Sequence, residues 1–220
     1  MRKGYVMNEI FSRLRRSQSY NWLKIPCVVI IETYQWWRRK YSSPSPSFMK
    51  RKVLIRNGID GATWVETGTY LGETTKFLSR GAVRVVSIEP EPDLYRRAQK
   101  RFSDIPNVEL VNGTSEEVLE EVLNQIEGKV NFWLDGHYSA GVTYLGEKVS
   151  PIEEELSAID RHFKKFEEIA VLVDDVRIFD PLVAEDSGYP TIDLLVDWAE
   201  SHSLRWKIEH DIFIATNGNQ

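Results

Sequence analysis

From residue 62 onward, short apolar and β-branched runs alternate with segments whose apolar positions recur at helical spacing. Five runs are typical of buried strands: residues 63–66, 83–89, 108–112, 130–135 and 169–174. The segments between them predict four helices: residues 74–80, 93–102, 115–125 and 150–166. Strands that alternate with helices indicate βαβ units, and therefore a parallel sheet.

The pattern changes near the end of the chain. Residues 191–202 predict a further helix, and two short strands follow at 205–209 and 211–216, separated only by His210. Strands joined by so tight a turn pair antiparallel. The sequence therefore predicts an α/β fold: a Rossmann-like, doubly wound sheet of seven strands, mostly parallel, with a C-terminal antiparallel hairpin.

The segment before this pattern has a different composition. Residues 41–47, Tyr-Ser-Ser-Pro-Ser-Pro-Ser, offer no apolar face and are typical of a linker. We therefore expect two parts: an N-terminal extension with its linker over residues 1–46, and one α/β domain over residues 47–220 that carries the active site.

Charge is divided unevenly along the chain. Residues 1–50 carry ten Lys and Arg against two acidic residues, whereas the rest carries 18 basic and 31 acidic residues. The basic residues of the extension are interleaved with aromatic ones: Trp22, Tyr34, Trp36 and Trp37. This pattern suits peripheral contact with an anionic membrane or another polyanion. The alternative is a solvated helix that docks on the domain through its aromatic side chains.

Several classes of protein are disfavoured. The longest apolar run, residues 25–31, contains a proline and is much shorter than the roughly 20 residues that span a bilayer, and it lacks the order of a signal peptide. Cys27 is the single cysteine, which excludes an internal disulfide, and the four histidines show no zinc spacing. The acidic body disfavours nucleic acid as a partner. We expect a cytoplasmic protein, peripheral to a membrane at most.

Candidate chemistry begins after the first predicted strand. In a doubly wound sheet, ligands bind beyond the carboxyl ends of the strands. There the sequence reads Glu66-Thr-Gly-Thr-Tyr-Leu-Gly72, in which two glycines allow close backbone approach and a tight helix start. The spacing is not the G-x-G-x-x-G that cradles a pyrophosphate, and Glu66 would repel one. An acidic loop suits the cationic amino acid end of S-adenosylmethionine instead; an ordinary strand-to-helix turn is the alternative.

Further candidate cofactor residues belong to the same loop and to the ends of the second, third and fourth predicted strands. Glu89 ends the second strand, in the position where an acidic residue binds ribose hydroxyls. Asn112 to Ser115 offer small polar groups for an adenine edge, although a helix cap explains them almost equally well. The candidate cofactor-binding residues are Glu66, Thr67, Gly68, Thr69, Gly72, Thr74, Thr75, Glu89, Gly113, Thr114, Ser115 and Asp135.

The fourth and fifth strands end in carboxylates. Asp135 is followed closely by His137, and Asp174 and Asp175 follow an apolar strand directly. Three carboxylates at one sheet edge repel one another unless a cation neutralises them, and oxygen ligands favour Mg²⁺. The sequence therefore predicts a metal site formed by Asp135, Asp174 and Asp175. The alternative is that Asp174 caps a loop and Arg177 pairs with Asp175.

These residues carry a resemblance to a known family. The three aspartates match the metal-dependent O-methyltransferases of the class I fold. Residues 62–75, 135–139 and 173–175 resemble, more closely, bacterial proteins related to macrocin O-methyltransferases, which are assigned to polysaccharide or natural-product modification. The resemblance covers residues 45–217. It implies a seven-stranded fold, S-adenosylmethionine as cofactor, Mg²⁺, and methylation of a hydroxyl on a sugar, a polysaccharide precursor or a natural product.

One position departs from that family. The catechol-type enzymes carry a lysine as general base shortly after the metal aspartate, whereas this sequence reads Gly136-His137-Tyr138-Ser139. His137 becomes the candidate catalytic base, with Asp135 beside it, because imidazole titrates near neutral pH. The glycine-containing segment 141–149 is a candidate substrate loop or a simple connection.

Two other functions remain open from the sequence. The first is a nucleotide-dependent oxidoreductase in which Glu89 binds the ribose of NAD. The second is a non-catalytic scaffold that binds S-adenosylmethionine and docks through its basic extension. The sequence leaves the methyl acceptor and the oligomeric state undetermined.

Overall fold

A computed structural model of the chain describes residues 21–135, 150–182 and 189–218. The chain divides into two compact units, residues 1–49 and residues 50–220. The division falls three residues beyond the domain boundary expected from composition, within helix α3 (Ser47–Asn57). No helix in the described ranges is both long enough and apolar enough to cross a membrane.

The first unit contains helix α2 (Asn21–Arg38), which presents apolar side chains to solvent. Ile30, Tyr34 and Trp37 are more than half exposed. Their spacing of four and three residues places them on one side of the helix. Within the same unit, Glu32 accepts hydrogen bonds from the backbone N–H and the hydroxyl of Ser47, at 2.9 and 3.0 Å.

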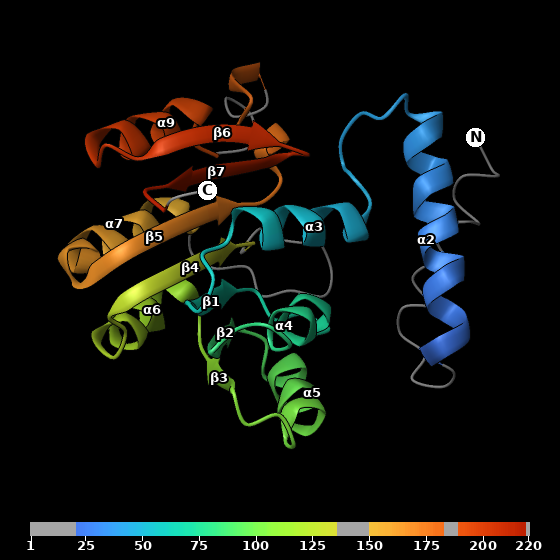
Figure 1. Ribbon diagram of the computed structural model, residues 1–220, viewed down its shortest axis with the longest axis horizontal. Coiled ribbons are helices and arrows are strands. Elements are labelled where there is room, and N and C mark those ends of the chain that lie inside the picture. Colours follow the sequence, from blue (N-terminus) through green and yellow to red (C-terminus); the bar gives the residue numbers. More distant parts are fainter. Residues whose placement is uncertain (1–20, 136–149, 183–188, 219–220) are drawn as a thin grey trace. The chain divides into compact units, whose positions relative to one another are not determined.

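The second unit is built on one seven-stranded sheet (Figure 1). Its strands are β1 (Thr63–Thr67), β2 (Arg84–Glu89), β3 (Val108–Asn112), β4 (Gly128–Leu134), β5 (Phe166–Val173), β6 (Arg205–Glu209) and β7 (Ile212–Thr216). They lie in the order β3-β2-β1-β4-β5-β7-β6. The first five pair in parallel, while β7 runs antiparallel to both β5 and β6. The predicted mostly parallel sheet with its C-terminal antiparallel hairpin is confirmed.

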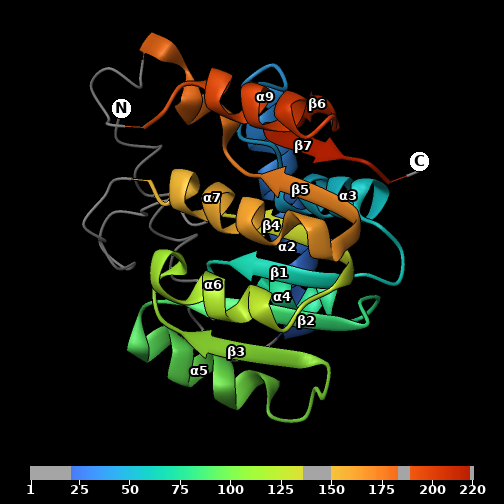
Figure 2. The same cartoon turned by 90° about the vertical axis from the view of Figure 1, so that its left-hand side faces the viewer.

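Helices cover both faces of this sheet. Figure 2 shows α6, α7 and α9 on the face toward the viewer, with α3, α4 and α5 behind the strands. The bounds of those not yet given are α4 (Glu73–Leu78), α5 (Pro92–Phe102), α6 (Ser115–Asn124), α7 (Ile152–His162) and α9 (Ile192–Ser201). Two short 3₁₀ turns are η1 (Phe163–Lys165) and η2 (Val176–Phe179).

Alternation along the central strands builds two hydrophobic cores. Val65 and Phe132 pack toward the face of α6, α7 and α9, while their neighbours Trp64 and Trp133 pack toward the face of α3 and α4. Successive side chains of a strand point to opposite faces, so a strand covered on both sides is apolar throughout. This explains why the predicted strands are continuous apolar runs.

The helix predicted over 150–166 is shorter in the structure. It begins at Ile152, whose N–H donates to the Ser150 hydroxyl at 3.4 Å, and ends at His162, before the η1 turn. Phe166 is already the first residue of β5, and its ring meets Phe132 edge-on with centroids 5.9 Å apart. In the sequence the helical pattern of apolar positions continues through Phe166, because a single buried aromatic residue fits the spacing of a helix as well as that of a strand.

Candidate functional site

The order of the strands places a switch point between β1 and β4. These strands are neighbours, but the chain visits β2 and β3 between them. A crevice at the carboxyl ends of the strands is the expected ligand site in such a sheet. The loops after β1, β2, β4 and β5 meet at this edge, where the Asp135 N–H donates to the Thr67 carbonyl and the Asp174 N–H donates to the Leu134 carbonyl.

The loop after β1 is bound to the end of β2. The backbone N–H groups of Gly68 and Thr69 both donate to the carbonyl oxygen of Ile88, at 3.0 Å each. Gly72 closes the loop as the N-cap of α4 with φ of +72°, where a Cβ would lie 2.7 Å from the ring of Phe102. Both the backbone conformation and the lack of space require glycine at this position.

Glu66 lies beneath this loop and is buried. Its Oε2 accepts hydrogen bonds from the hydroxyls of Thr75 and Ser87, both at 2.6 Å. Thr69 and Ser87 share a further hydroxyl–hydroxyl bond of 2.6 Å. Burial raises the pKa of Glu66 to about 7, although the two hydroxyl bonds oppose the shift. The hydroxyls of Thr69 and Thr75, two of the candidate cofactor-binding residues, thus form hydrogen bonds within the protein.

Ser87 belongs to the hydrogen-bond network around Glu66 but was not among the predicted site residues. The signal was present, because Ser87 is a polar residue inside the otherwise apolar centre of β2. Thr74, another candidate, is half-buried in the first turn of α4.

Glu89 is held at the end of β2 by two backbone groups. The Tyr70 N–H donates to its Oε2 at 2.6 Å, and the Glu91 N–H donates to its Oε1 at 3.0 Å. Burial raises the pKa of Glu89, against the effect of these bonds. A carboxylate has about four lone-pair sites. One backbone bond on each oxygen therefore fixes the group and leaves capacity on each oxygen for a ligand hydroxyl.

The segment after β3 lies against the same strand end. The Gly113 N–H donates to the Glu89 carbonyl at 3.2 Å. Thr114 is the N-cap of α6, and its N–H approaches the Glu117 carboxylate at 3.5 Å, as in a capping box. The helix-cap interpretation of this segment is therefore correct, and its position beside Glu89 still suits an adenine edge.

Glu155, in the first turns of α7, is a buried carboxyl group that the sequence did not point to. Burial raises its pKa to about 7, while the hydroxyls of Ser115 and Thr67 oppose the shift. A pocket lies at the carboxyl ends of β4 and β5. It is lined by Leu134, Asp135, Ser150, Pro151, Ile152, Glu155, Val173, Asp174, Ile178, Phe179 and Tyr189. Two of the predicted site residues, Asp135 and Asp174, thus share a pocket with Glu155.

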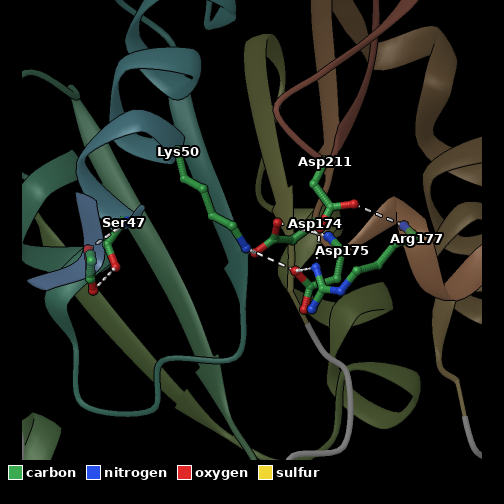
Figure 3. Close-up of polar contacts among 7 residues, drawn as sticks. Ser47, Lys50, Asp174, Asp175, Arg177 and Asp211 are labelled. Atoms are coloured by element: carbon green, nitrogen blue, oxygen red, sulfur yellow. Dashed lines mark hydrogen bonds and ion pairs between the residues drawn. The ribbon is translucent and has the colours of Figure 1, made fainter. Parts of the chain in front are cut away.

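The aspartates after β5 bind cationic side chains (Figure 3). The ammonium of Lys50, from α3, donates to Asp174 Oδ2 at 2.6 Å and to Asp175 Oδ1 at 2.9 Å. Arg177 donates to the same Asp175 oxygen at 2.7 Å and also pairs with Asp211. Asp174 Oδ1 accepts the Asp175 N–H at 2.8 Å. The alternative considered from the sequence, a loop cap by Asp174 and an Arg177–Asp175 pair, describes these contacts.

The charges of this group influence one another. Burial would lower the pKa of Lys50, but Asp174 and Asp175 outweigh it and raise that pKa above its ordinary value. Burial and repulsion by Asp135 raise the pKa of Asp174, while Lys50 opposes them. Asp135 therefore lies near enough to act electrostatically on both groups.

The described residues do not form the Mg²⁺ site that the sequence predicts. Within 21–135, 150–182 and 189–218, no three His, Cys, Asp or Glu side chains are grouped as ligands for one metal ion. The reason is physical: the Lys50 ammonium binds one oxygen of Asp174 and one of Asp175, which a metal ion would need as ligands. As arranged, these residues do not fit a divalent ion. The candidate base His137 and the segment 141–149 lie outside the described residues.

No protein-family model and no curated protein matches the chain. Solved structures do match it. An O-methyltransferase from Bacillus cereus in complex with SAH is 14% identical with a TM-score of 0.54, covering 94% of this chain and 96% of its own. A protein assigned as a caffeoyl-CoA O-methyltransferase from Staphylococcus aureus is 11% identical with a TM-score of 0.52, covering 97% and 100%. The N-methyltransferase NodS from Bradyrhizobium japonicum is 13% identical with a TM-score of 0.50, covering 77% and 93%. The chain shares the fold of these proteins.

Proposed function

We propose that this protein is an S-adenosylmethionine-dependent methyltransferase. The observation that carries the proposal is Glu89, a buried carboxylate at the end of β2 that the backbone N–H groups of Tyr70 and Glu91 fix beside the loop after β1. Adjacent ribose hydroxyls each donate a hydrogen bond, and Glu89 has the acceptor capacity to receive them. The structural neighbours support the proposal, since their names describe methyltransferases and one was solved with SAH.

The charge of the site favours this cofactor over a dinucleotide. The loop lacks the G-x-G-x-x-G spacing for a pyrophosphate, and the carboxyl groups of Glu89 and Asp135 stand at the ends of β2 and β4. S-adenosylmethionine contains no phosphate and carries a sulfonium and an ammonium group. An acidic strand edge attracts such a cation and repels a pyrophosphate.

The proposed reaction is methylation of a hydroxyl on a sugar, a polysaccharide precursor or a natural product. The acceptor oxygen forms a bond to the methyl carbon as the carbon–sulfur bond breaks, the hydroxyl proton passes to His137, and S-adenosylhomocysteine leaves. Asp135, at the end of β4, is placed beside that base in the sequence. Such a transfer depends mainly on positioning and on the management of charge. A magnesium-assisted form would require Lys50 to leave Asp174 and Asp175.

Calorimetry with S-adenosylhomocysteine and, separately, with NAD tests the cofactor. We expect saturable binding of S-adenosylhomocysteine and none of NAD; binding of NAD alone would replace the proposal with the oxidoreductase alternative. Transfer of label from methyl-labelled S-adenosylmethionine to hydroxyl acceptors tests the reaction. Cofactor binding without transfer to any acceptor offered would favour the non-catalytic scaffold.

We also propose that the first unit contacts an anionic membrane surface. Its exposed row of Ile30, Tyr34 and Trp37 is followed by the exposed cations Arg38, Arg39 and Lys40. Apolar and aromatic side chains next to basic ones are the features of helices that lie in a membrane interface.

A further inference from the structure

The aspartates after β5 and the Asp211 side chain, from the turn between β6 and β7, are nearly buried, and burial makes their charge costly. The side chains of Asp174, Asp175 and Asp211 are 4%, 7% and 3% exposed. A buried carboxylate is tolerated only when it is paired or protonated. Among the described residues, Lys50 and Arg177 pair with these three groups, and Asp135 adds a fourth carboxylate nearby.

The fold fixes Lys50 in this place. Lys50 precedes Val53 and Leu54 by three and four residues on α3, and those two side chains are fully buried in the core. Residues three and four apart share one face of a helix. The burial of Val53 and Leu54 therefore turns Lys50 toward the sheet as well, and its side chain is only 18% exposed. Figure 3 shows its ammonium pointing toward Asp174 and Asp175, with a dashed line to each.

A divalent ion and this ammonium compete for the same oxygens. Mg²⁺ requires near-octahedral oxygen ligands at about 2.0–2.1 Å. Lys50 holds Asp174 Oδ2 at 2.6 Å and Asp175 Oδ1 at 2.9 Å, and Arg177 shares the latter oxygen at 2.7 Å. Binding of a metal would have to expel Lys50 from a position where its helix is anchored in the core.

We infer that Lys50 is the resident cation of the aspartate group formed by Asp135, Asp174 and Asp175, in the place where the sequence predicts Mg²⁺. The group therefore selects against divalent ions as long as Lys50 is present. Lys50 supplies a fixed positive charge that chelators cannot remove. This inference shares its site with the proposed function but rests only on the contacts of Lys50.

Titration with Mn²⁺, followed by electron paramagnetic resonance on the full chain in metal-free buffer, tests this inference. We expect the wild type to bind no stoichiometric Mn²⁺. Lys50→Ala removes the competing charge and should bind one Mn²⁺ per chain at least about tenfold more tightly, because a unit charge about 3 Å away is worth more than 1.4 kcal/mol inside a protein. Lys52→Ala is the matched control. It removes the same charge from an exposed position of α3 and should leave Mn²⁺ binding unchanged.

Two results would overturn the inference. The first is a wild-type protein that binds one Mn²⁺ per chain and loses it in Asp174→Asn. The second is a folded Lys50→Ala protein that gains no Mn²⁺ binding. If Lys50→Ala does not fold while Lys52→Ala does, the uncompensated carboxylates are the cause and the inference is supported. Calorimetry with S-adenosylhomocysteine on the wild type reports on the proposed function separately, so either idea can fail alone.

Discussion

Glu89 is held by the backbone N–H groups of Tyr70 and Glu91 and has room for two more donors. Glu89→Gln replaces one acceptor oxygen by an NH₂ group, which then faces a backbone donor and can no longer receive a ribose hydroxyl. A buried donor without a partner costs about 1–3 kcal/mol. We expect roughly 10- to 100-fold weaker binding of S-adenosylhomocysteine by calorimetry, since 1.4 kcal/mol is about tenfold.

The control for this variant is Glu109→Gln on β3, where Glu109 pairs with Arg84 at the surface. It removes the same charge and should bind S-adenosylhomocysteine as the wild type does. Equal affinities for the Glu89 and Glu109 variants would exclude Glu89 as the ribose partner.

Individual residues were predictable where chain order alone determines their position. Glu89 ends a strand and Asp174 directly follows one, so the doubly wound pattern by itself puts both at the ligand edge. Lys50 was not predictable, because it lies 124 residues before Asp174 and reaches it only through the packing of α3. Glu155 was missed for the same reason: the hydroxyls that act on its carboxyl group, those of Thr67 and Ser115, come from other parts of the chain.

At the scale of elements, the turn from β1 into α4 depends on Gly72. Gly72→Ala introduces a Cβ at φ of +72°, and that atom would lie 2.7 Å from Phe102. The left-handed conformation alone costs an alanine about 1–2 kcal/mol. Gly61→Ala is a matched control, since Gly61 has the same φ of +72° and nothing within 4 Å of its Cβ position.

We therefore expect Gly72→Ala to lower the free energy of unfolding in urea by more than Gly61→Ala, because the clash with Phe102 adds to the backbone strain. It should also weaken binding of S-adenosylhomocysteine, whereas Gly61→Ala should not. Equal destabilisation of the two variants would mean that the Phe102 ring moves aside without cost. The loop between β1 and α4 would then be less constrained than its contacts indicate.

The membrane proposal for α2 is also a property of an element. Replacing Ile30, Tyr34 and Trp37 together by serine removes the exposed apolar row and keeps every charge. We expect the full chain to sediment with vesicles that contain anionic lipid, and the triple variant to do so much less, because interfacial binding scales with apolar area. Trp206→Ser, which removes an exposed tryptophan from β6, should sediment as the wild type does. Equal sedimentation of all three proteins would contradict the proposal.

The extent of the elements was predicted to within a few residues. The largest difference is the boundary between α7 and β5, where Phe166 belongs to the strand. Its side chain fits the helical period and the strand equally well, so its contact with Phe132 on the neighbouring strand β4 decides.

At the scale of the whole molecule, the sheet was the most predictable feature. Parallel strands require crossover helices, and crossovers are right-handed, which leaves few arrangements for five alternating units. The hairpin of β6 and β7 follows from a turn of two residues, His210 and Asp211, both with positive φ. Chain order does not determine which side chains neutralise the carboxylates at the ends of the strands. That depends on how helices such as α3 pack against the sheet.

The two buried glutamates with raised pKa values make the stability of the molecule depend on pH. Glu155 has a pKa of about 7 in the folded protein against 4.5 in its ordinary environment, and Glu66 is raised similarly. Between these values the folded state binds more protons than the unfolded state, so the free energy of unfolding falls as pH rises through this window.

Glu155→Gln cannot ionise and should remove the Glu155 share of this loss, at most about 3 kcal/mol at 1.36 kcal/mol per pKa unit. Urea denaturation at about pH 5 and about pH 8 measures it. The wild type should lose more stability between the two pH values than Glu155→Gln, while Glu153→Gln, at an exposed position of the same helical turn, should follow the wild type. Equal losses in all three proteins would mean that Glu155 titrates normally and that water reaches its carboxyl group.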